Sequence, residues 1–477
     1  MAEPRRGDRH GRAPRPVPTA AGGTMREVTR AADVGRPPPT AGGADVNADV
    51  KNLLRTMASQ AVPLALAAVA GVFLARCLQP EGRGVYATVT TTAGIATVLG
   101  HLSVGRSQIA LWPLLERRRP MAGNAAILGL ALGLTSAAAT LGVVTVLSLA
   151  PSPALMVMAL LAVPFAVAVV NLKGIALLEG RVGLANRSVV TAAVVQYVPI
   201  LVMAVTGTVT LTAVVVCWTV STILPFALFV RPLGLPTPGD AALARRQLAL
   251  SGRYHLGTMA LHLLLTVDVL LLGALVTPAE VGLYTVATSL LSLSRVPTDA
   301  LAQITLSRQA VRDEADARHV TARTIRLTLL LSCAAVGALA CASPLLVPLV
   351  YGPAFAASVT PLLALAPGAV AWSLLRPLEQ YLVRLGRPMR MTAIAAGALA
   401  SNLALNAVLI PLWGARGAAF ASTLSYGAMV AVEVGWFARA AGLGAADLLP
   451  RFGDARRVVS ALRGRRCGNA SAATSRS

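Results

Sequence analysis

The chain has 477 residues, of which 55% are hydrophobic and 13% are charged, and its mean hydropathy is +0.67. Soluble domains carry about 25% charged residues, so this composition excludes a soluble globular protein. The net charge of +22 does not indicate nucleic-acid binding, because half of the basic residues lie between apolar runs, where membrane topology uses them.

The chain begins with residues 1–50, which are rich in Pro, Gly, Ala and Arg and predict a disordered cytoplasmic tail. Twelve apolar segments follow, each long enough to cross a hydrocarbon core of about 30 Å. Their predicted bounds are 53–75, 84–105, 123–149, 153–171, 188–206, 209–230, 254–276, 281–305, 325–350, 357–383, 391–412 and 417–438. We therefore predict an all-α polytopic membrane protein with two six-helix lobes (51–231 and 254–438), a cytoplasmic linker (232–253) and a basic cytoplasmic tail (439–477).

The loops between these segments differ in charge from one side to the other. Five loops hold 17 arginines, and the six on the opposite side hold three, namely Arg76, Arg83 and Arg416. Cytoplasmic loops carry the excess of basic residues, so both termini are predicted to be cytoplasmic.

The predicted external loops are too short to form a catalytic domain. The segments also lack HExxH, GxSxG or a paired-carboxylate loop, and the five cysteines show no metal-ligand spacing. The sequence therefore predicts no enzyme, no catalytic residue, no metal site and no cofactor.

Two weak internal repeats relate the halves of the chain. In QPEGRGVYATVT and TPAEVGLYTVAT, a proline, a glycine, a tyrosine and a threonine recur at one offset, Pro80 matching Pro278 and Gly84 matching Gly282. GRVGLANR and VRLGRPMR share a second pattern six spans apart. Parallel repeats of this kind occur in transporters that work by alternating access around a central cleft.

The stretches FLARCLQPEGRGVYATV, LLLGALVTPAEVGLYTVATSL, VYGPAFAASVTPLLALAPGAV and NLALNAVLIPLWGARGAAFASTLSY together resemble the polysaccharide flippases. These are the oligosaccharide-lipid translocases of the multidrug/oligosaccharidyl-lipid/polysaccharide exporter superfamily. The resemblance covers nearly all of residues 53–438. It implies two lobes that form a V-shaped cavity and a substrate in which sugars are linked to a polyprenyl pyrophosphate.

Charged residues inside the apolar segments are candidates for substrate binding. Arg295 lies well inside the eighth segment with Asp299 one turn later, and a buried charge there costs several kcal/mol. Arginine binds pyrophosphate through its planar fork. Arg295 is therefore the first candidate for the pyrophosphate, and the alternative is an ion pair with Asp299. Arg376 and Glu379, three apart in the tenth segment, form a second couple, for which a helix-end salt bridge is the alternative.

Three further residues are candidates by position. Arg76 and Arg83 flank the first hairpin on the external side, against the topology rule, and are predicted to assist substrate binding. Asp268 is a lone carboxylate in the seventh segment, where burial favours its neutral form. Protonation, or a bound cation, would couple it to a gradient, and Asp299 and Glu379 are further coupling candidates.

The sequence thus predicts a multi-pass protein of the bacterial cytoplasmic membrane that flips a polyprenyl-pyrophosphate-linked oligosaccharide to the outer leaflet for polysaccharide or envelope assembly. The predicted partners are this substrate, anionic membrane lipids and envelope glycosyltransferases, with no nucleic acid. Two alternatives stay open: a multidrug exporter of the same fold, and a non-transporting membrane scaffold for envelope biosynthesis.

Overall fold

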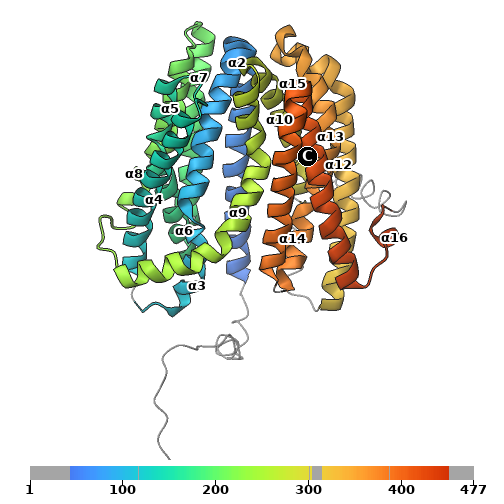
Figure 1. Ribbon diagram of the computed structural model, residues 1–477. Helices are drawn as coiled ribbons and strands as arrows, with labels where there is room; N and C mark the ends of the chain where they lie inside the picture. Colours follow the sequence, from blue (N-terminus) through green and yellow to red (C-terminus); the bar gives the residue numbers. More distant parts are fainter. Residues whose placement is uncertain (1–42, 117, 300, 303–313, 386, 451–477) are drawn as a thin grey trace, which may run out of the picture. The chain divides into compact units, whose positions relative to one another are not determined.

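The computed structural model describes residues 43–116, 118–299, 301–302, 314–385 and 387–450 (Figure 1). It divides into two compact units, residues 1–53 and 54–477. The second unit holds all of the predicted second lobe and all of the first except residues 51–53. The described residues are all α, as the sequence predicts.

The helices of the first lobe are followed by those of the second in chain order. The first lobe comprises α2 (Gly43–His101), α3 (Val104–Leu111), η1 (Trp112–Leu114), α4 (Arg119–Val146), α5 (Pro153–Leu160), α6 (Val163–Leu178), α7 (Val182–Thr206) and α8 (Leu211–Val230). The second comprises α9 (Ala241–Leu275), α10 (Pro278–Ser294), α12 (Glu314–Tyr351), η2 (Pro353–Ser358), α13 (Val359–Ser373), α14 (Leu375–Arg384), α15 (Pro388–Ala441) and α16 (Ala445–Leu448).

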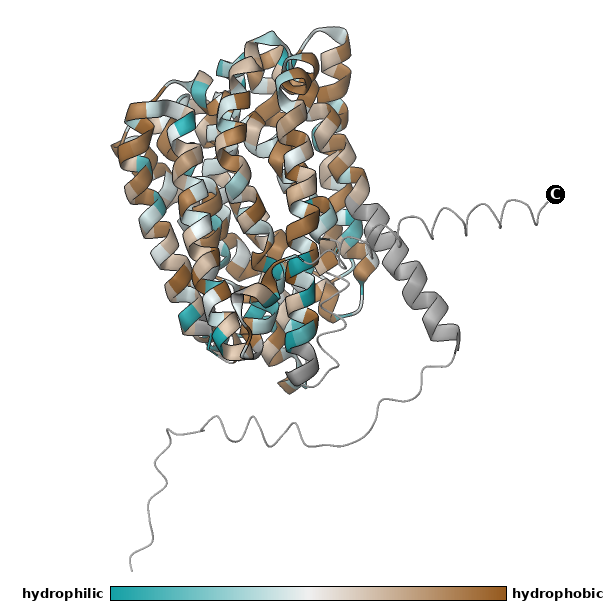
Figure 2. Ribbon diagram, turned by 90° about the vertical axis from the view of Figure 1, so that its right-hand side faces the viewer, coloured by the Kyte–Doolittle hydropathy of each residue, from teal (hydrophilic) through white to brown (hydrophobic). Residues whose placement is uncertain are grey.

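Nine helical stretches in the described residues are long and apolar enough to cross a membrane. Two of them, in α2 and α15, hold two spans each, because the chain bends sharply at Gln79 and Gly414. The 17-residue helix α10 supplies a further span. These helices account for the twelve predicted spans. Most residues along these helices are hydrophobic, and hydrophilic residues are more frequent near the helix ends (Figure 2).

The two bends replace loops that the sequence analysis placed at residues 76–83 and 413–416. Gln79 has a φ of 57° and precedes Pro80, which has no N–H to continue the helix. Gly414 has a φ of 56°, a conformation that costs glycine little. We call the end of the bundle that carries these two bends the outer end, following the predicted topology, and the opposite end the inner end.

Both predicted tails need correction where they meet the helices. Helix α2 begins at Gly43, inside the tail predicted for residues 1–50, because residues 43–50 contain no proline to stop it. Helix α15 continues to Ala441 and ends on Gly442 in a left-handed conformation. Residues 1–42 and 451–477, the remainder of both tails, lie outside the described residues.

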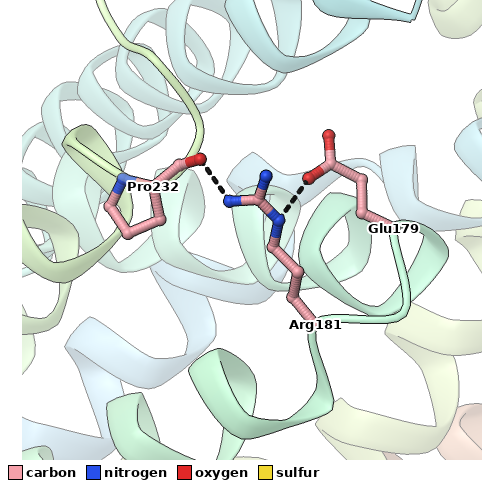
Figure 3. A network of polar contacts seen from close by, with 3 residues as sticks. All are labelled: Glu179, Arg181 and Pro232. Atoms are coloured by element: carbon pink, nitrogen blue, oxygen red, sulfur yellow. Dashed lines mark hydrogen bonds and ion pairs between the residues drawn. The ribbon is translucent and has the colours of Figure 1, made fainter.

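Each lobe is held by its own helix contacts. In the first lobe α4 packs on α6 and α7 packs on α8, and in the second α15 packs on α9 and α13 (Figure 1). Helix α9 joins them, since it contacts α3 and α4 as well as α10 and α15. The inner end of the first lobe is tied by Arg181, whose Nε lies 3.0 Å from a Glu179 carboxylate oxygen and whose Nη1 donates to the Pro232 carbonyl (Figure 3). An exposed ion pair of this kind contributes little stability.

The duplicated motif forms a reciprocal contact between the lobes at the outer end. A Cβ added to Gly84 would overlap the carbonyl oxygen of Pro278, and a Cβ added to Gly282 would overlap that of Pro80. The glycine of each repeat therefore packs on the proline of the other. This close approach explains why the repeat keeps glycine at the same place in both lobes.

We predict that Gly84→Ala and Gly282→Ala each destabilise the protein, because the overlapped atoms are backbone and cannot rotate away. Overpacking of this kind costs about 1–3 kcal/mol, so the midpoint of thermal unfolding in detergent should fall. Gly94→Ala is the matched control, since Gly94 lies on the same helix as Gly84 and an added Cβ would meet nothing within 4 Å. All three variants gain the same helix propensity. Equal midpoints for all three would contradict the contact.

Candidate functional site

A cavity of 230 Å³ lies between the lobes below the outer contact. Its walls come from α2 and α7 of the first lobe and from α10 and α12 of the second. Helix α2 contributes both of its arms, the parts before and after the bend at Gln79. Its polar lining consists of Arg83, Tyr86, Tyr197, Ser289, Ser292 and Tyr351. The cavity therefore combines one cationic side chain with five hydroxyl groups.

Arg83 is the charged group of this cavity. Its Nε is buried and has no hydrogen-bond partner among the described residues, and no ion pair reaches its guanidinium in that part of the chain. The guanidinium carbon lies 5.7 Å from the ring centroid of Tyr86, within the range of a cation–π contact. The Tyr86 hydroxyl accepts from Gln196 Nε2 at 3.1 Å. Arg83 as a whole is partly buried. A partly buried cation without a counter-ion is favourable to an anionic ligand, because pairing replaces the lost hydration.

Arg76 hydrogen-bonds across to the second lobe, and its predicted part in substrate binding stays a prediction. Its Nε donates to the carbonyl of Val350 at 2.8 Å and its Nη2 to that of Leu349 at 2.5 Å. These carbonyls belong to the last turn of α12, where no intrahelical partner remains and a cation is favoured. The fork of Arg76 is thus occupied by the end of α12.

Arg295 lies closer to the inner end of the bundle than the sequence suggests. It is the C-cap of α10, about 25 Å along the helix from Pro278 at 1.5 Å per residue, and so closer to the inner edge than to the centre of a bilayer core of about 30 Å. It is partly buried, and Asp299 one turn later is exposed. No ion pair joins the two among the described residues. Arg295 follows Ser292 of the cavity wall by one turn of helix.

Arg376 and Glu379 do not line the cavity between the lobes. Arg376 is exposed and Glu379 is partly buried, both on α14. The predicted salt bridge between them is absent from the described residues. Their roles in substrate binding and coupling stay predictions.

Asp268 occupies a separate, fully buried polar cluster within the second lobe. Its carboxylate accepts from the Tyr284 hydroxyl at 2.7 Å, from Asn406 Nδ2 at 2.8 Å and from the Ser422 hydroxyl. Asn406 Nδ2 also donates to Asn402 Oδ1 at 3.0 Å. These five side chains are buried and come from α9, α10 and both arms of α15. A lone carboxylate is tolerated at this depth because three donors surround it.

Sequence reasoning missed the side chains that complete the cavity between the lobes and the cluster around Asp268. The chain has only seven tyrosines, and three of them line the cavity, so tyrosines inside apolar segments were an available signal. Asn402 and Asn406 stand four residues apart in an apolar run, which places two amides on one helix face. Such a pair marks a buried polar partner elsewhere in the bundle.

Twelve spans in two repeated lobes, with a cavity between the lobes, define a two-lobed exporter-type membrane protein. A family model described as "Polysaccharide biosynthesis protein" matches residues 73–360, more than half of the chain. The chain belongs to this family, and the resemblance seen in its sequence is confirmed. The predicted multi-pass membrane localisation is confirmed as well.

Solved structures show the same fold. One described as lipid II flippase MurJ in an inward closed conformation is similar with a TM-score of 0.68 and 11% identity, covering 84% of this chain and 89% of that one. An inward-facing multidrug resistance MATE family transporter of the MOP superfamily gives 0.65 and 15%, covering 81% and 98%. An outward-facing transporter of that family gives 0.53 and 13%, covering 82% and 96%. Comparison with the curated proteins finds no match.

We predict that Asp268→Ala strongly destabilises the protein, because Tyr284, Asn406 and Ser422 would lose their common acceptor. A buried donor left unpaired costs about 1–3 kcal/mol, so the loss should exceed that of Tyr284→Phe, which removes a single bond. Thermal unfolding in detergent measures both. Asp299→Ala is the control, since this exposed carboxylate lies outside the cluster, and it should leave the midpoint unchanged. The cluster would be refuted if Asp268→Ala and Asp299→Ala behaved alike.

Proposed function

We propose that this protein flips a polyprenyl-pyrophosphate-linked oligosaccharide from the inner to the outer leaflet of a bacterial cytoplasmic membrane. The observation that carries the proposal is the cavity between the lobes, with the uncompensated guanidinium of Arg83 in its wall. A pyrophosphate carries about two negative charges and offers acceptors to an arginine fork. Membership in the polysaccharide biosynthesis family supports a sugar-containing substrate.

Arg83 and Arg295 would bind the pyrophosphate in succession. Arg83 aligns with Val281 in the repeat, and Arg295 lies 14 residues further along the same helix direction, about 20 Å lower at 1.5 Å per residue. Ser289 and Ser292 of α10 line the cavity between these two levels. Arg295 would take the pyrophosphate near the inner end, and Arg83 would hold it near the outer end. Arg76 would act on the lobe contact rather than on the substrate.

The size of the cavity limits what it holds in this conformation. Pockets for small molecules usually measure about 300–1,000 Å³, so 230 Å³ suits a pyrophosphate group and not an attached oligosaccharide. Passage of the sugar therefore requires the lobes to separate. At the outer end this means parting the two glycine–proline contacts and the hydrogen bonds of Arg76 to α12. Alternating access by rocking of the lobes is the motion that such a design requires.

The same features weigh against the alternatives. A multidrug exporter for cationic substrates would favour an acidic cavity, whereas the only charged side chain lining this cavity in the described residues is an arginine. A membrane scaffold has no need of a partly buried arginine with an unpaired Nε between its lobes. We propose a transporter, with no catalytic group of its own.

Coupling to a gradient would rest on Asp268. Asp268 lies within the second lobe and accepts a hydrogen bond from Tyr284 of α10. Helix α10 also lines the cavity between the lobes. Binding of a proton or a monovalent cation to the carboxylate would change the hydrogen bonds that hold α9, α10 and α15 together. Binding of the ion would thereby shift the equilibrium between conformations in which the lobes are in contact and conformations in which they are apart.

We predict that Arg83→Ala lowers the rate of flipping of a fluorescent undecaprenyl-pyrophosphate sugar in proteoliposomes by about 10- to 100-fold, as expected for loss of a charge-assisted hydrogen bond worth about 1.5–3 kcal/mol. Arg83→Lys should lie between, because it keeps the charge and loses the fork. Arg295→Ala should also slow flipping.

Arg416→Ala is the matched control for these variants. Arg416 is an exposed arginine of the outer end that does not line the cavity, and its loss should leave the rate unchanged. Normal flipping by a well-inserted Arg83→Ala protein would rule out the pyrophosphate role of the cavity. Equal loss in Arg83→Ala and Arg416→Ala would point to outer-end charge in general.

We further predict that Asp268→Asn retains substrate binding and loses the response of flipping to an imposed gradient, since the amide replaces the carboxylate at similar size without its charge. Proteoliposomes with a pH gradient alone, a sodium gradient alone or neither separate the two ions. Glu116→Gln is the control, because this exposed carboxylate is not a coupling candidate, and it should respond like the unmodified protein. A full gradient response in Asp268→Asn would exclude Asp268 as the coupling group.

A further inference from the structure

A second, larger cavity opens between the inner ends of the two arms of α15. It measures 880 Å³, and its lining includes Arg387, Arg390, Ile394, Val432, Trp436 and Arg439. We call it the α15 groove. All its lining residues lie between Leu385 and Ala440, so the first lobe contributes none of its wall. The groove is therefore separate from the cavity between the lobes.

The polar end of the α15 groove concentrates positive charge without compensation. Arg387, Arg390 and Arg439 are all exposed, and no ion pair reaches them among the described residues. No acidic side chain lines the groove. The guanidinium carbon of Arg390 lies 5.9 Å from the ring centroid of Trp436. Three like charges at one end of a groove repel one another, and an anion placed among them relieves that repulsion.

The rest of the α15 groove is apolar and faces outward. Its wall is formed by small and aliphatic residues, namely Ala393, Ile394, Ala431, Val432, Gly435 and Ala440. Val432 is 55% exposed on a helix that spans the membrane, so in a bilayer it contacts acyl chains. A tryptophan between the charged and the apolar part matches the level of lipid headgroups. The groove is thus amphipathic in the same sense as a phospholipid.

We propose that the α15 groove binds an anionic phospholipid of the inner leaflet, with the headgroup phosphate on Arg387, Arg390 and Arg439 and one acyl chain along Ile394, Val432 and Gly435. Charge complementarity selects an anionic lipid over a zwitterionic one, and basic pockets between membrane helices are known to hold such headgroups. A free phosphate would leave the apolar wall uncovered. A transported lipid would need contact with both lobes, which this groove does not offer.

The test uses the purified full-length chain in phosphatidylcholine vesicles that contain a small fraction of brominated lipid. Bromine on the acyl chains quenches nearby tryptophan, and subtraction of the Trp436→Phe signal isolates Trp436. Brominated phosphatidylglycerol should quench Trp436 at about tenfold lower mole fraction than brominated phosphatidylcholine. Equal quenching by the two lipids would overturn the proposal.

Two sets of variants locate the effect. The combined change Arg387→Gln, Arg390→Gln and Arg439→Gln should bring the preference for phosphatidylglycerol close to one. The control combination Arg119→Gln, Arg245→Gln and Arg246→Gln removes the same charge from exposed inner-end positions outside the groove and should keep the preference. If both combinations lost it equally, the preference would come from overall charge and the site would be refuted.

Two further experiments test the apolar wall of the groove and the source of the phosphate. Gly435→Leu fills the groove where an added Cβ meets nothing within 4 Å, and should weaken quenching with all three arginines present, whereas Gly427→Leu on the same helix should not. Unchanged quenching in Gly435→Leu would overturn the proposed chain position. Undecaprenyl pyrophosphate at equal mole fraction should not displace phosphatidylglycerol. Displacement would make the groove a substrate site instead.

Discussion

The contact of Gly84 with the carbonyl oxygen of Pro278, repeated by Gly282 on Pro80, sets how closely the lobes approach at the outer end. A side chain larger than hydrogen at either glycine would push the helices apart, because the opposing atoms are backbone. The close approach places Arg76 within reach of the last carbonyls of α12. Arg83, which lines the cavity between the lobes, precedes Gly84 by one residue, so the contact and the cavity wall are neighbours in the chain.

The lobes share this scaffold and differ in the chemistry attached to it. Tyr86 and Tyr284 occupy equivalent places in the repeat, yet the first accepts a hydrogen bond from Gln196 and the second donates to Asp268. The first tyrosine lines the cavity between the lobes, and the second lies in a buried cluster inside one lobe. The duplicated frame therefore carries an arginine in the wall of the cavity between the lobes and, separately, a buried carboxylate inside the second lobe.

The sequence predicted the spans and part of the candidate site. Arg83 was recognisable as a positive charge on the side where topology disfavours it, but Arg295 ranked higher because it lies well inside its apolar segment. The bend at Gln79 and the end of α10 at Ser294 changed that order, since they place Arg83 at the wall of a cavity and Arg295 near the inner edge. Burial of an arginine Nε depends on neighbours from distant segments, which a hydropathy pattern does not contain.

The sequence by itself determined that the chain is a twelve-span membrane protein with two repeated halves. The length of the apolar segments and the charge of the loops are local properties, and they decide insertion into a bilayer and orientation across it. It also placed glycine, proline and tyrosine at matching positions in the two halves. Only the tertiary structure decided that Arg83 has an unpaired Nε and that Arg76 hydrogen-bonds between the lobes. It also decided which donors surround Asp268. Most of those contacts join residues more than a hundred positions apart, where helix packing fixes which side chains meet.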